Sequence, residues 1–128
     1  MSSRTSPLPV DVVIAVLHRV RDKVRIRDDV RLAQLFNDAA KKHPTVFGMF
    51  VWHPKYHDCP ILAETLHILD MGGGIERFNA ATRWYQATEV TLGSEGQNVY
   101  STFGDAEKAA VDELAEQIKR AFGSESTK

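Results

Sequence analysis

The stretch of sequence that decides the expected fold is residues 59–100, CPILAETLHILDMGGGIERFNAATRWYQATEVTLGSEGQNVY. Apolar residues recur at helical spacing from Pro60 to Met71, which predicts a helix with one buried face. The residues expected to face inward, on or beside that face, are Ile61, Leu62, Leu66, Ile68 and Leu69. Gly72-Gly73-Gly74 is expected to end the helix, because glycine adopts the left-handed capping conformation at little cost.

Extended segments are expected after these glycines. Ile75 to Phe78 predicts a short strand, Asn79-Ala80-Ala81 a turn, and the alternating stretch Arg83 to Leu92 a second strand. Gly93 to Gly96 interrupts the alternation before Gln97 to Ser101. The predicted order is therefore a helix followed by a β-hairpin.

Three further helices are predicted outside this stretch. One begins near Pro9, and its unusually wide apolar surface places it at the centre of the fold. A second covers Val30 to Lys42, and the last begins at Asp105 and extends to Phe122. The aromatic and β-branched run Thr45 to Trp52 predicts another strand or a buried extended segment.

Length and composition indicate one soluble domain. The chain has 128 residues, of which 9–122 are expected to fold while 1–8 and 123–128 are frayed. Its single cysteine, Cys59, excludes an intramolecular disulfide and fits a reducing compartment. The apolar run Val12 to Leu17 is too short to cross a bilayer and lacks the features of a signal peptide. A cytoplasmic protein with no membrane partner is expected.

The helix-and-hairpin stretch resembles a known regulator pattern. PILAETLHILDMGGGIERF…RWYQATEVTLGSEGQNVY is similar to the L..L...G.I…Y.LT..G pattern of PadR- and MarR-like proteins. With RLAQLF and FGMFVWHP before it, the order also resembles phage-associated Panacea-type proteins, several of which act as antitoxins. In those regulators a glycine follows the threonine sooner than it follows Thr88 here. The resemblance implies an α+β fold, a winged helix-turn-helix with a β-wing and an additional C-terminal helix.

The resemblance also implies a DNA-binding regulator. In such proteins the helix enters the major groove of double-stranded DNA while the wing reaches the neighbouring backbone. The candidate nucleic-acid-binding residues are Lys55, Tyr56, His57, Thr65, Arg77 and Arg83. The two arginines flank the predicted hairpin turn, where guanidinium groups can follow phosphates.

Charge argues partly against DNA. The expected exposed face of the helix presents Glu64, Thr65, His67 and Asp70, without the Lys, Arg, Asn or Gln side chains that usually read base edges. Residues 45–128 carry twelve acidic and seven basic side chains, whereas residues 1–44 carry five and nine. The alternative is a protein–protein interaction module, such as an antitoxin or phage-related adaptor, on the same scaffold.

One cluster has the chemistry of metal ligands. His53, His57, Cys59 and His67 could supply imidazoles and a thiolate to zinc, but their spacing matches no common zinc framework. A Cys59–His57 nucleophile pair lacks a visible orienting group and oxyanion site. We therefore expect no cofactor, no metal, no catalytic residue and no enzyme activity.

The last predicted helix bears on oligomeric state. Its apolar stripe is wide enough to pack on the first helix of the same chain, or to pair with its copy in a homodimer. Both arrangements are open from the sequence.

Overall fold

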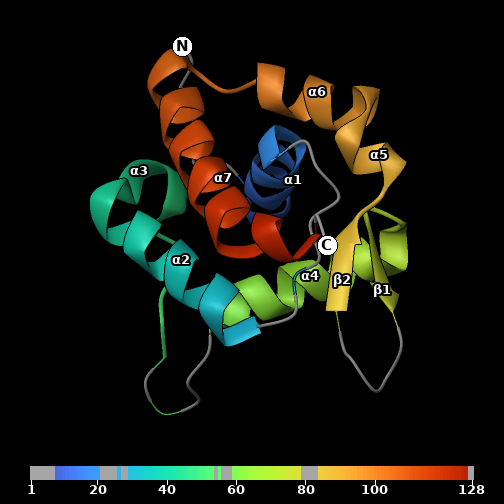
Figure 1. Cartoon of the computed structure of the whole chain (residues 1–128). Coiled ribbons are helices and arrows are strands. Elements are labelled where there is room, and N and C mark those ends of the chain that lie inside the picture. The colour runs from blue at the N-terminus through green and yellow to red at the C-terminus, as the bar shows by residue number, and fades with distance from the viewer. Residues whose placement is uncertain are drawn as a thin grey trace.

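The computed structural model describes residues 8–20, 26, 29–53, 55, 59–78 and 84–126 (Figure 1). In these residues it contains seven helices and two short strands. Their order is α1 (Pro9–Val20), α2 (Asp29–Lys42), α3 (Pro44–Phe47), α4 (Pro60–Gly72), β1 (Ile75–Phe78), β2 (Trp84–Ala87), α5 (Glu89–Leu92), α6 (Ser94–Ser101) and α7 (Asp105–Ser126).

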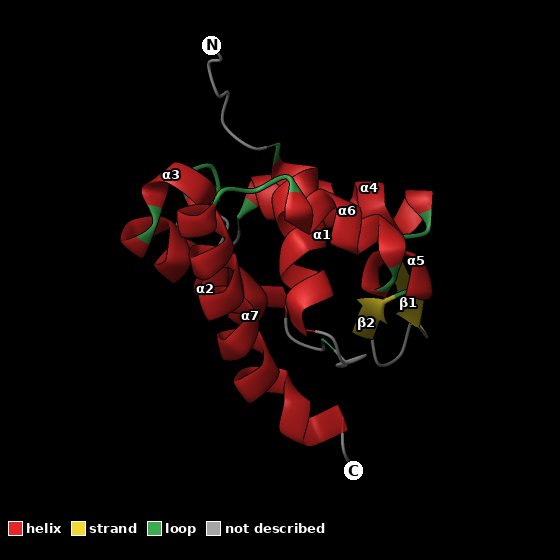
Figure 2. Cartoon of the chain, turned by 90° about the horizontal axis from the view of Figure 1, so that it is seen from above, coloured by secondary structure: helices red, strands yellow, loops and turns green. Residues whose placement is uncertain are grey.

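Helix α1 occupies the centre of the molecule. Its residues Val12, Val13, Ala15 and Val16 are buried almost completely. Helices α4, α5, α6 and α7 all pack against it, and Figures 1 and 2 show it enclosed among them. The prediction of a central first helix is confirmed, because a helix that is apolar on most of its surface must be covered on most sides.

The predicted strand or buried extended segment from Thr45 to Trp52 is wrong at its start, because residues 45–47 belong to helix α3. Pro44 occupies the first turn of α3, where its missing amide hydrogen costs nothing, and the amides of Val46 and Phe47 donate to the carbonyl of His43. The turn that follows brings the ring of Phe50 to 4.9 Å from that of Phe36 in α2. A short helix followed by a turn buries these aromatic side chains as well as a strand would, so the apolar composition of the run fits either structure.

Helix α4 ends as the glycines predict. Gly73 has a left-handed φ of 85°, and the amide of Gly74 donates to the carbonyl of Leu69 at 2.8 Å. This pair of features forms a Schellman-type cap, which turns the chain into β1. Strand β1 pairs antiparallel with β2, with Ile75 opposite Ala87 and Phe78 opposite Trp84.

The second predicted strand, Arg83 to Leu92, is wrong beyond Ala87. The Thr88 amide donates to the Gly74 carbonyl at 3.1 Å, and the Thr91 hydroxyl donates to the same oxygen at 2.8 Å. These bonds end the ladder, and the chain continues as α5. Residues 97–101, which follow the interruption at Gly93 to Gly96, lie within α6. The predicted turn at 79–81 lies outside the described residues.

The predicted α+β winged helix is therefore wrong. Helices dominate the described chain, and the strand material is limited to one short antiparallel pair of four residues on each side. The segments expected to supply the rest of a wing fold as α5 and α6. The helix, glycine cap and first strand occur in the predicted order, but the expected β-wing does not form around them.

The apolar stripe of α7 is used within the chain. Its buried members are Ala110, Val111, Leu114, Ala115, Ile118 and Phe122, and α7 packs on both α1 and α2. This confirms that the last helix packs on the first, and it leaves that stripe unavailable for a homodimer. The helix continues beyond the predicted end at Phe122, to Ser126.

Among the helices of the described residues, none combines the length and apolar composition that crossing a lipid bilayer requires.

Candidate functional site

The predicted nucleic-acid-binding residues do not form a described surface. Lys55 is exposed in the loop before α4, and Arg77 lies in β1, opposite Tyr85 in the strand register. Thr65 is only 3% exposed, and its hydroxyl donates to the Ile61 carbonyl at 2.7 Å, so it faces the interior and not a groove of DNA. The others, Tyr56, His57 and Arg83, lie outside the described residues.

The four residues with the chemistry of metal ligands are not brought together in the part of the set that the structure describes. Cys59 is buried at the start of α4, whereas His53 and His67 are exposed. Within the described part of the chain, no three His, Cys, Asp or Glu side chains lie close enough together to hold a metal ion. His57 lies outside the described residues.

The outer face of α4 carries an unexpected apolar surface. Ile61, Ile68 and Met71 are 37%, 52% and 77% exposed. The prediction that Ile61 and Ile68 face inward is wrong, because Leu62, Leu66 and Leu69 already fill the side that packs on α1 and β1. Helix α4 is thus apolar on two sides, and only one of them is covered.

Spacing joins these exposed residues into one stripe. Ile61, Glu64, Ile68 and Met71 stand at i, i+3, i+7 and i+10, which is the a-d-a-d spacing of two heptads. Glu64 is exposed, so the stripe has one carboxylate among three apolar side chains. We call these four residues the α4 stripe. The sequence contained this signal, but the stronger leucine pattern of the buried face obscured it.

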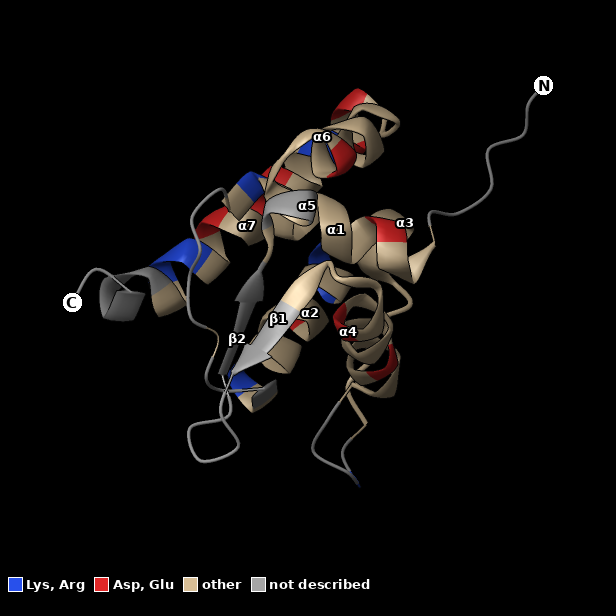
Figure 3. Ribbon diagram, turned by 90° about the vertical axis from the view of Figure 1, so that its right-hand side faces the viewer, with Lys and Arg blue, Asp and Glu red and all other residues tan. Residues whose placement is uncertain are grey.

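The electrostatics of α4 are acidic. The helix contains Glu64 and Asp70 and no lysine or arginine, and Figure 3 shows its ribbon coloured by acidic residues alone. His67 is exposed one turn from Glu64, on the edge of the stripe. Carboxylates of this kind repel phosphate.

A buried histidine on α1 was missed by the sequence analysis. His18 is 7% exposed, with Nδ1 3.2 Å from the carbonyl oxygen of Thr91 and Nε2 2.9 Å from Oε1 of Gln97. The carbonyl can only accept, so Nδ1–H donates to it. The side-chain amide of Gln97 lies within hydrogen-bonding distance of Nε2, so the ring contacts both α5 and α6 from α1. The His18 side chain therefore joins α5 and α6 to α1 in the interior of the molecule.

A second polar cluster connects α1, α6 and α7. The Asp112 carboxylate accepts a hydrogen bond from Nε of Arg19 at 2.7 Å and lies 3.1 Å from the Tyr100 hydroxyl. The Arg19 guanidinium also lies 4.7 Å from the centre of the Tyr100 ring. Every group in this cluster has a partner within it, which indicates a structural role.

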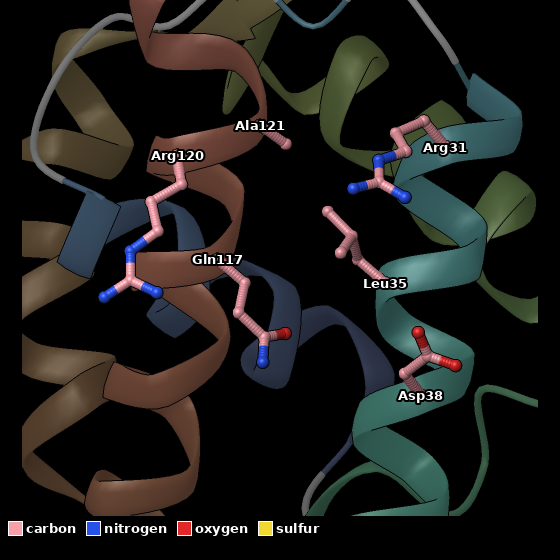
Figure 4. A pocket seen from close by; sticks show the side chains of 6 residues that line it. All are labelled: Arg31, Leu35, Asp38, Gln117, Arg120 and Ala121. Carbon is pink, nitrogen blue, oxygen red and sulfur yellow. The ribbon is translucent and has the colours of Figure 1, made fainter.

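A shallow groove runs between α2 and α7. It has a volume of about 370 Å³ and is lined by Arg31, Leu35, Asp38, Gln117, Arg120 and Ala121 (Figure 4). Figure 4 shows Arg31 and Gln117 extending toward the space between the helices. A smaller cavity of about 70 Å³ adjoins it at Asp38 and Gln117. The lining combines charges of both signs, without a nucleophile and base in contact.

Hydrogen bonds between α2, the residue after it and α7 lie at the end of the smaller cavity. Lys42 and His43 both hydrogen-bond to the Glu113 carboxylate, the latter at 3.0 Å. These two hydrogen bonds hold the pKa of Glu113 below its ordinary value. The carboxylate therefore serves to join α2 to α7.

Comparison with known proteins finds no matching family model, no matching curated protein and no matching solved structure. The resemblance to winged-helix regulators stays a prediction from the sequence, without the fold that it implied.

Proposed function

We propose that this chain is a protein-interaction module that docks its partner on the α4 stripe. The observation that carries this proposal is the exposure of Ile61, Ile68 and Met71 on one face of a regular helix. Within the described residues, these are three of the six large hydrophobic side chains that are exposed. Clustered apolar exposure of this kind marks interaction surfaces, whereas single exposed side chains are ordinary.

The other exposed hydrophobic residues serve as a comparison. Leu8, Val30 and Val51 lie before α1, at the start of α2 and after α3. No two of them share an element, so they do not form a helical stripe. Val51 is 60% exposed, which makes it a matched control position for substitutions in α4.

The alternative of DNA binding has less support. Affinity for DNA comes largely from Lys and Arg side chains that neutralise phosphates. The α4 helix has neither residue type, and Thr65 is buried. Contact through Lys55, Tyr56, His57, Arg77 and Arg83 stays a prediction from the sequence, and a salt series tests it.

Site-specific photocrosslinking in the cells that naturally make the protein tests the proposal. A benzophenone side chain placed at Met71 should give a discrete protein adduct, while the same group at Val51 should not. Adding Ile68→Asp to the Met71 probe should remove the adduct, because an apolar contact is lost and a second carboxylate then lies within the stripe. Equal labelling from both positions, or no adduct from Met71, contradicts the proposal.

The second part of the test measures binding of the protein to duplex DNA by fluorescence anisotropy. The proposal expects no binding that depends on α4. Tight binding that weakens with salt and survives Ile68→Asp would support the DNA alternative instead.

A further inference from the structure

We infer that the occupant of the α4 stripe is a second copy of this chain, which pairs its own α4 antiparallel to the first about a two-fold axis. This inference rests on the proposed function, because it names the partner of the same surface.

The α4 stripe can pair with a reversed copy of itself, because each a position then meets a d position. In an antiparallel pair of helices, a positions face d positions of the partner. Ile61 and Ile68 occupy a positions, and Glu64 and Met71 occupy d positions. Reversing the stripe places Ile61 opposite the partner's Met71 and Glu64 opposite the partner's Ile68. A two-fold interface needs this property, since one patch must fit itself.

Charge selects the antiparallel direction. In a parallel pair, Glu64 would face the partner's Glu64, and two carboxylates opposite one another repel. In the antiparallel pair, Glu64 faces an isoleucine and lies beside the partner's His67, which precedes that isoleucine in the chain. The absence of lysine and arginine from α4 leaves this imidazole as the basic group that the helix itself can offer.

The size of the stripe limits the strength of the pair. Helix α4 has 13 residues, or two heptads, and its apolar side chains are already partly covered. Stable interfaces usually bury about 1,200 Å² or more in total, and two short helices bury less. The dimer is therefore weak, and it forms and dissociates with protein concentration.

The α7 helix does not compete as a dimer surface. Its apolar stripe is buried against α1 and α2. The outer face of α4 is the helical surface of the described chain that combines regular spacing with apolar exposure.

Sedimentation velocity of the purified chain, from about 10 to about 500 µM, tests the inference. The wild-type chain should shift from monomer toward dimer over this range. Glu64→Leu completes the apolar a-d-a-d pattern and should tighten the dimer at least about tenfold. Ile68→Asp should hold the chain as a monomer, while Val51→Asp should behave as wild type. A wild-type monomer at every concentration overturns the inference.

Disulfide trapping tests the antiparallel register. A mixture of Ile61→Cys and Met71→Cys chains should form a covalent dimer under mild oxidation, because these positions face one another. Either variant alone should not, since like positions lie about 15 Å apart along the axis. The native Cys59 is buried and serves as the unreactive background. Equal trapping with and without mixing overturns the antiparallel pair.

The two proposals fail in distinguishable ways. A monomer in sedimentation together with an adduct of Met71 to a different protein removes the second copy and keeps the interaction module. A monomer with no adduct removes both. Self-adducts from Met71, with a dimer that Glu64→Leu strengthens, support both.

Discussion

At the scale of single residues, Gly96 shows how closely two elements approach. A Cβ atom at this position would lie 1.8 Å from the Thr91 carbonyl oxygen and 2.9 Å from Nδ1 of His18. The nearest atom belongs to the backbone, so rotation of a side chain cannot relieve the contact. The close contact of His18 with α5 and α6 therefore requires glycine at position 96 of α6.

We expect Gly96→Ala to lower the free energy of unfolding by about 1–3 kcal/mol or more, because the methyl group must displace backbone. Gly72→Ala is the matched control. A Cβ at Gly72 would meet nothing within 4 Å, and there the substitution should leave stability unchanged or raise it by up to about 1 kcal/mol. Urea denaturation of the three chains measures both effects. An equal effect at both positions would contradict the close approach.

The Glu113 carboxylate gives stability a dependence on pH. Its pKa in the folded chain is lowered from about 4.5, chiefly by the hydrogen bond from Lys42. A lowered pKa stabilises the fold above the ordinary value, and this contribution is lost as the pH falls through the lower, folded-state pKa.

We expect Glu113→Gln to reduce the free energy of unfolding at pH 7 by about 0.2–1 kcal/mol, because the group is partly exposed to solvent. The difference from wild type should shrink as the pH falls below the ordinary pKa of a glutamate and through the lower pKa of Glu113 in the folded chain, because the carboxylate is then protonated. Denaturant titrations across this range measure it. Glu116→Gln, on the exposed side of α7, should show no such dependence, and a parallel loss in both variants would contradict the assignment.

At the scale of elements, helices were predictable where one face alone is apolar. The patterns over Val30 to Lys42 and after Asp105 predicted α2 and α7. Gly72-Gly73-Gly74 predicted the end of α4, because the left-handed cap is a local property of the chain. The apolar run that became α3 has no clear period and was misassigned, since four to eight such residues fit a strand or a buried helix equally. The segment that became α5 was misassigned for another reason, because its alternation is typical of a strand.

The change from β2 to α5 depends on contacts that the local sequence does not reveal. The hydroxyl of Thr91 reaches back across the chain to the carbonyl of Gly74, and its own carbonyl accepts from His18. Gly74, which is 17 positions away in the sequence, and His18, which is 73 positions away, thus decide where the strand ends. Alternation alone continued the strand to Leu92.

We expect Thr91→Val to lower the free energy of unfolding by about 1 kcal/mol, because a buried hydroxyl loses its hydrogen bond while the shape is kept. Thr102→Val is the control, since its hydroxyl bonds to the Val99 carbonyl at an exposed site and water can replace it. Thermal or urea unfolding measures the two variants. No difference between them would contradict the role of Thr91 at this junction.

At the scale of the whole molecule, α1 connects parts that do not otherwise meet extensively. It contacts α4 on one side and α7 on another, and it carries α5 and α6 through His18. Since these contacts share one buried helix, we expect the described chain to unfold as a single cooperative unit.

Val16→Ala tests this cooperativity. Loss of two methyl groups at a fully buried position should lower the free energy of unfolding by about 1–3 kcal/mol. Hydrogen exchange should then become faster in α4 and in α7, by a factor that is the same for both helices. Val30→Ala, at an exposed position of α2, should change stability by less than about 0.5 kcal/mol. Faster exchange confined to one side of α1 would show that the molecule opens in parts.

The candidate site was only partly predictable at this scale. The sequence placed an exposed acidic face on residues 60–71, and Glu64 and His67 are exposed there. It put Ile61 and Ile68 inside and Thr65 outside, because helical periodicity alone does not tell how wide the covered face is. That width depends on α1 and β1, which reach only the leucine side of α4.

The packing of α1 on α7 has a consequence for biosynthesis. A ribosome releases α1 long before α7, so one side of this valine-rich helix stays uncovered in the nascent chain until α7 leaves the exit tunnel. Messages truncated ahead of Asp105 should yield products that chaperones retain and proteases remove.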